Sequence, residues 1–104
     1  MAYRTQNTKV NDSLQPPQSL DAEQAVLGSL LKDSDAVFQA IEVINNPDLF
    51  YYPKHQIIYR AIMELYEKSE PCDITTVSNV LLKDNNLEKI GGRLYLVELV
   101  EGVI

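Results

Sequence analysis

Apolar side chains recur every three or four residues along most of this chain, the spacing that places them on one face of an α-helix. Between these stretches lie short clusters of Asp, Asn, Ser, Gly and Pro, which end one helix and begin the next. No segment alternates apolar and polar residues between hairpin turns, as a half-buried strand would. The pattern predicts helices at about residues 20–31, 35–44, 53–68, 74–83 and 93–101, with a short turn at 87–90.

These elements predict an all-α fold, a compact orthogonal bundle of five to six short helices around one core. The helix at about 53–68 has the widest apolar stripe and is therefore the expected central helix. The polar residues 1–18 lack helical periodicity, so they are expected to form a flexible arm. A single helical domain is predicted for residues 19–104, since a chain of 104 residues suits one domain.

Side chains that cap helices mark several of the expected helix starts. Ser19 or Asp21 can cap the first helix, and Ser34 is the best candidate for the second. Asp73 or Thr75 is expected to start the fourth.

Three glycines and one proline have clear conformational roles in this pattern. Gly28 lies inside the first helix, where glycine costs about 1 kcal/mol relative to alanine, so close approach of a second helix is expected there. Gly91 and Gly92 permit a tight reversal before the last helix. Pro53 suits the first turn of its helix. The chain is still apolar at Ile104, which predicts a domain boundary or the start of a linker.

The charge balance limits which partners are plausible. With 15 acidic and 9 basic side chains the formal net charge is −6, which repels a polyphosphate backbone and argues against tight duplex binding. A single cysteine can form neither an internal disulfide nor a zinc site, as suits a reducing cytoplasm. Neither a signal peptide nor a membrane helix is evident, so a soluble cytoplasmic protein is predicted.

Few residues are candidates for chemistry. His55 is the only histidine, and one histidine without partner ligands predicts packing or a hydrogen bond to a neighbouring helix. Glu23 is interpreted as a first-turn carboxylate that favours its own helix N-terminus, rather than as a salt bridge to a partner. Cys72 is interpreted as an ordinary thiol. No catalytic, cofactor-binding or metal-binding site is therefore predicted.

Several tyrosines raise the question of base stacking on single-stranded DNA. Too few basic residues accompany them, so packing in the core or at an interface is the favoured interpretation. Tyr95 follows the Gly91-Gly92 turn and falls partly off the apolar stripe. It is therefore the residue expected to contact a partner protein.

Four segments together resemble the N-terminal domain of the bacterial replicative DNA helicases of the DnaB family. Residues 19–28, SLDAEQAVLG, resemble the pattern S-I/L-E/D-A-E-Q-x-V-L-G, and residues 50–59 resemble F-Y-x-x-x-H-x-x-I-F/Y. Residues 71–77 resemble P-V/I-D-L/I-I/V-T-V/L, apart from Cys72 and Thr75, and residues 91–99 resemble G-G-x-x-Y-L-x-E/D-L. The segments occur in order and span nearly all of the predicted domain. Glu23, Gly28, Pro53, His55, Gly91 and Gly92 are the signature positions among them.

The resemblance implies a helical domain distinct from the ATP-dependent motor of the family. A motor of that kind needs the phosphate loop G-x-x-x-x-G-K-S/T, whose amides and lysine hold the phosphates. None of the four glycines here is followed by Lys-Ser or Lys-Thr. This chain is therefore expected to be no enzyme and to bind no cofactor, while ATP and magnesium belong to a motor domain that it does not contain.

The resemblance also implies a role and a set of partners. Domains of this family pair, and three pairs form a hexameric collar that receives the C-terminal domain of primase and responds to the helicase loader. DNA is then contacted only through the full-length ring, and no membrane is involved. The isolated domain is expected to be a monomer or a weak dimer. Two alternatives are a helix-turn-helix DNA-binding module, disfavoured by the acidic balance, and a small enzyme, for which no constellation is present.

Overall fold

The computed structural model describes residues 18–102, and within them the chain is helical with no strand. The all-α prediction is confirmed, while the predicted arm lies almost wholly outside the described residues. Residues 18–102 contain five α-helices, namely α2 (Leu20–Lys32), α3 (Ala36–Val43), α4 (Pro53–Glu67), α5 (Ile74–Lys83) and α6 (Gly92–Glu101). Two short 3₁₀ turns in the same part of the chain cover Pro47–Leu49 and Glu88–Ile90. The turn expected at 87–90 is therefore also present.

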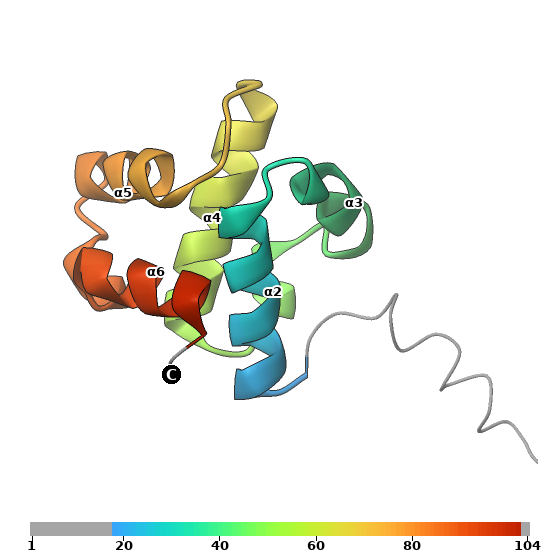
Figure 1. Cartoon of the computed structure of the whole chain (residues 1–104), viewed down its shortest axis with the longest axis horizontal. Coiled ribbons are helices and arrows are strands. Elements are labelled where there is room, and N and C mark those ends of the chain that lie inside the picture. The colour runs from blue at the N-terminus through green and yellow to red at the C-terminus, as the bar shows by residue number, and fades with distance from the viewer. Residues whose placement is uncertain (1–17, 103–104) are drawn as a thin grey trace, which may run out of the picture.

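Helix α4 is the centre of the bundle, as its wide apolar stripe predicted. It packs against α2, α3 and α5 and against both 3₁₀ turns. Figure 1 shows α2 lying alongside α4, with α5 and α6 running across one side of this pair and α3 on the other. Helix α6 packs chiefly on α2, so the first and last described helices are neighbours.

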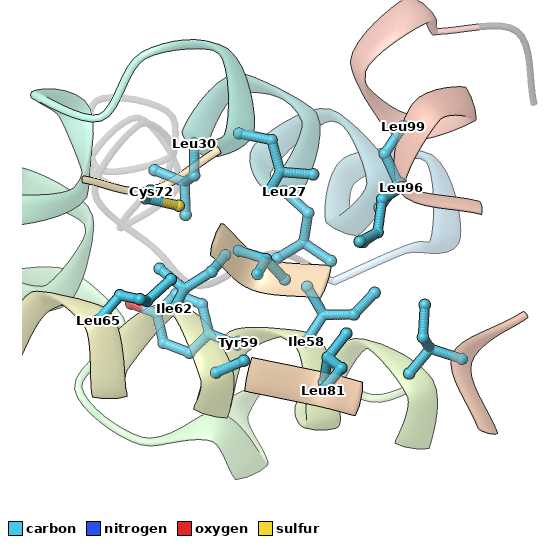
Figure 2. Packing of buried hydrophobic residues seen from close by; sticks show 14 of the residues in the cluster. Leu27, Leu30, Ile58, Tyr59, Ile62, Leu65, Cys72, Leu81, Leu96 and Leu99 are labelled. Carbon is cyan, nitrogen blue, oxygen red and sulfur yellow. The ribbon is translucent and has the colours of Figure 1, made fainter. Parts of the chain in front are cut away.

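The core fills the space between these helices. Leu27 and Leu30 of α2 meet Ile58 and Ile62 of α4, with Leu96 of α6 closing one side (Figure 2). All of these side chains are buried, and each fully buried leucine or isoleucine contributes roughly 1.5–3 kcal/mol relative to an exposed one. The burial of these stripes is what holds short helices together.

The helix caps agree with the sequence at two positions and differ at a third. Ser19 caps α2 by accepting the N–H of Ala22, and Asp73 caps α5 in a reciprocal capping box with Thr76. Ser34 was expected to cap α3, and this was wrong. Its hydroxyl instead accepts the N–H of Cys72 at 2.9 Å, because the loop before α5 passes beside it. Ser34 therefore joins two segments that are distant in sequence.

The glycine and proline positions behave as predicted. A Cβ on Gly28 would collide with the main-chain carbonyl of Leu99, so α2 and α6 touch backbone to backbone there. Gly91 and Gly92 have φ angles of 104° and 78°, which turn the chain into α6 in a conformation that other residues rarely adopt. Pro53 occupies the first turn of α4, where no N–H is needed.

Candidate functional site

The carboxylate of Glu23 lies fully buried where α2 meets the segment that leads into α4. It accepts the backbone N–H of Tyr51 at 2.6 Å and that of Tyr52 at 3.4 Å. Glu23 does lie in the first turn of α2, as interpreted, but its hydrogen bonds are made to distant segments and not within its own helix. The cause is tertiary: the segment after the Pro47–Leu49 turn folds against α2 and brings two backbone donors to the carboxylate.

His55 continues this polar cluster from α4 and is also fully buried. Its Nδ1 atom lies 2.7 Å from Oε1 of Glu23, and its Nε2 atom lies 2.6 Å from the hydroxyl of Tyr95. The His55 and Tyr95 rings are stacked, with centroids 5.9 Å apart. The prediction that His55 bonds to a neighbouring helix is confirmed, and it reaches two of them, α2 and α6.

The partners fix the direction of each hydrogen bond in this chain of side chains. An ionised carboxylate only accepts, so the Nδ1–H of His55 donates to Glu23. Nε2 of the neutral ring then accepts the O–H of Tyr95. The Tyr95 oxygen in turn accepts the side-chain N–H of Gln24 at 3.3 Å. Every buried polar group of the cluster thus has a partner, as a stable core requires.

Tyr95 lies elsewhere than the sequence suggested. It was expected partly off the core stripe, but only 7% of its surface is exposed. After the Gly91-Gly92 reversal, α6 is oriented so that Tyr95 is buried on the same side as Leu96 and Leu99. Lys54 covers its ring, with Nζ 3.9 Å from the centroid. The contact of Tyr95 with a partner protein stays a prediction. In this structure its side chain has little exposed surface with which to make that contact.

Burial lowers the pKa of His55 below its ordinary value of 6.5, outweighing the hydrogen bond and negative charge of Glu23, which act to raise it. Lys54 adds to the lowering. The folded state therefore takes up a proton less readily than the unfolded chain does. The stability that the neutral His55 ring contributes is fully present above pH 6.5, and it is lost as the pH falls through the pKa of His55 in the folded state.

We expect the free energy of unfolding to fall below pH 6.5, with a slope of at most about 1.4 kcal/mol per pH unit from this group. Urea unfolding at a series of pH values between neutral and mildly acidic would measure it. The His55→Gln variant removes the titrating ring and should show a flatter profile over the same range. Identical pH slopes for the two proteins would contradict the assignment.

No other group in the described part of the chain has the setting of a reactive residue. Cys72 is buried, and its burial raises the pKa of the thiol to about 12, which suits a packing role. Among residues 18–102 no cluster of His, Cys, Asp or Glu could hold a metal ion. The polar cluster itself is closed and satisfied internally, so what it can do is hold α2, α4 and α6 in register.

The described surface carries several exposed apolar side chains, which could contact a partner protein. Tyr51, on the segment held by Glu23, is the most exposed of them at 77%. Tyr59 and Tyr95 are buried as packing residues, whereas Tyr51 and Tyr66 are not. The large apolar residues that remain exposed are Leu20, Phe38, Leu49, Tyr51, Tyr66, Leu82 and Leu94. No helix between residues 18 and 102 has the length and apolar character needed to cross a bilayer.

Comparisons with known proteins place this architecture. A family model described as the DnaB-like helicase N terminal domain matches residues 15–104. The chain is 47% identical over 81 residues to the replicative DNA helicase DnaB of Leifsonia xyli, covering 78% of this chain and 18% of that protein. It is 45% identical over 89 residues to that of Mycobacterium leprae, covering 86% of this chain and 15% of the relative. The chain thus spans less than a fifth of either relative.

The similarity to a solved structure indicates the same family as the sequence comparisons. The crystal structure of the N-terminal domain of DnaB helicase from Mycobacterium tuberculosis is similar with a TM-score of 0.77 at 45% identity. The similarity covers 84% of this chain and 60% of that one. Fold and sequence therefore point to the same family.

Proposed function

We propose a function from one premise: the chain belongs to the family of DnaB-like helicase N-terminal domains. On that basis it is the non-catalytic head of a replicative DNA helicase. Its work is to pair with further copies of itself in a collar and to dock the C-terminal domain of primase.

One observation on the structure itself supports this proposal, in addition to the family membership. The buried side chains of Glu23 and His55 are bonded within the polar cluster, whereas large apolar residues are left on the surface, with Tyr51 and Leu94 among the most open. Aromatic and apolar side chains at the surface are the usual material of protein interfaces. The arrangement therefore supports a module that binds proteins rather than one that transforms a substrate.

The other partners follow from the same premise. Pairs of such domains would assemble in threes into a hexameric ring, and the helicase loader would act on this ring. ATP and magnesium would be bound by a motor domain outside this chain. DNA would be contacted through the assembled ring, and the protein would work in the cytoplasm.

Calorimetric titration of the 104-residue chain with the C-terminal domain of the primase from the same organism tests the docking proposal. We expect saturable heat and localised chemical-shift changes. Absence of both at high concentration would refute primase docking by this domain. A DNA oligonucleotide serves as the control ligand, and the acidic chain should bind it weakly at moderate salt.

The oligomeric state of the isolated 104-residue chain is a separate prediction. Sedimentation should show a monomer or a weak dimer.

A further inference from the structure

We propose that Tyr51 is the anchor of a docking surface, and that its ring inserts into an apolar pocket within a basic face of a partner protein. This assignment rests on the proposed primase-docking function and names the residue that would make the main contact. The surface consists of Leu49, the last residue of the Pro47–Leu49 turn, and Tyr51, which lies on the connector between this turn and α4.

The backbone that carries Tyr51 is fastened to the domain from two helices. Glu23 of α2 accepts the N–H groups of Tyr51 and Tyr52. Gln56 of α4 donates from Nε2 to the carbonyl of Phe50 at 2.7 Å. Phe50 itself is fully buried, with its ring centroid 4.9 Å from that of Tyr59. The connector is therefore held on both sides of the exposed ring.

The ring of Tyr51 is oriented as well as its backbone. It meets the Tyr52 ring edge-on, with centroids 5.1 Å apart and an angle of 84°. Tyr52 meets the ring of His55 in the same manner at 5.7 Å. A series of ring contacts thus leads from the buried His55 to the exposed Tyr51. A side chain ordered in advance loses less conformational freedom when a partner covers it.

The fold gains little from a large side chain at this position. Glu23 uses only the backbone N–H of Tyr51, which any residue except proline would supply, and 77% of the side chain faces solvent. Leu49, two residues earlier in the chain, is 40% exposed. An exposed tyrosine held by a ring contact and close in sequence to an exposed leucine has the properties of a binding anchor, since such rings contribute most when a partner desolvates them.

Charge indicates which kind of partner would cover this surface. The chain carries a formal net charge of −6, and Asp48, three residues before Tyr51, has most of its side chain exposed. Lys54, three residues after Tyr51, lies over the ring of Tyr95. The ion pair of Asp48 with Arg60 is a long 4.0 Å contact between two exposed side chains and neutralises little. A pocket rimmed by lysine or arginine would complement this surface.

The test titrates four forms of the 104-residue chain with the primase C-terminal domain: unchanged, Tyr51→Ala, Tyr51→Phe and Leu82→Ala. Leu82 is the matched control, because it is an exposed apolar residue on α5, away from the connector. We expect Tyr51→Ala to weaken binding at least about tenfold. Tyr51→Phe and Leu82→Ala should bind like the unchanged chain. Thermal midpoints should agree among all four, because neither side chain is buried.

Each result decides between the two proposals. If the unchanged chain does not bind primase, the docking function falls and this assignment falls with it. If it binds and Tyr51→Ala binds equally well, the anchor assignment alone is overturned. Loss of binding in Tyr51→Phe as large as in Tyr51→Ala would overturn the apolar pocket. A Tyr51→Ala effect on oligonucleotide binding with none on primase would overturn it in favour of a base-stacking tyrosine.

Discussion

Replacing Glu23 with alanine is expected to lower the free energy of unfolding by about 2–4 kcal/mol. The change removes the acceptor of two backbone N–H groups, those of Tyr51 and Tyr52, and of the His55 ring. The His55 ring is fully buried and the two N–H groups are partly buried, so water can replace the lost acceptor only in part. Stability of a domain of this size is about 5–15 kcal/mol, so the loss is a large fraction of the total.

Urea unfolding followed by circular dichroism measures the effect of Glu23→Ala. Glu42→Ala is the matched control, since Glu42 is an exposed carboxylate on α3, and it should change stability by no more than about 0.5 kcal/mol. Equal stabilities for the two variants would show that the buried carboxylate contributes nothing specific. The amide signals of Tyr51 and Tyr52 should shift most in Glu23→Ala, because they lose their acceptor.

Replacing Gly28 with alanine is expected to lower the free energy of unfolding by about 2–3 kcal/mol. The new methyl group would overlap the carbonyl of Leu99, which belongs to main chain and cannot rotate away as a side chain would. Helices α2 and α6 would have to move apart along their contact. Alanine's higher helix propensity, worth about 1 kcal/mol, acts in the opposite direction and is the smaller effect.

Ser29→Ala on the exposed side of α2 is the control for Gly28→Ala. It changes helix propensity without touching α6, so stability should stay equal or rise slightly. Thermal and urea unfolding would compare the two. A Gly28→Ala protein as stable as the unchanged chain would mean that α6 adjusts freely, contrary to the close contact described.

Local patterns in the sequence were sufficient for the helices and for several of their ends. The period of apolar residues located all five, and α4 was correctly expected at the centre. Pro53 could be interpreted from the sequence because its effect is conformational and acts at the residue itself. Gly28 could be interpreted because a glycine inside a helix is costly unless another element approaches closely there. Fold class and family were therefore predictable from the sequence.

The polar cluster was not predictable, because its members are far apart in sequence and each partner is supplied by another element. Glu23 lies 28 residues from the N–H of Tyr51, and Tyr95 lies 40 residues from His55. A first-turn glutamate on a helix is ordinarily a solvated charge, so nothing local marks Glu23 as buried. Ser34 was misassigned for the same reason, since its partner Cys72 is also distant.

The packing of α2 on α6 bears on how the chain acquires its structure during synthesis. Gly28 and Leu99 stand near opposite ends of the described residues, and Gln24 bonds to Tyr95 across 71 positions. The face of α2 that packs on α6 therefore cannot be covered until α6 has emerged from the ribosome, although α3 and α4 can cover other parts of α2 earlier. Contacts of such long sequence separation slow folding and leave apolar surface open meanwhile. The nascent domain thus depends on α6, synthesised long after Gly28, to protect this face of α2.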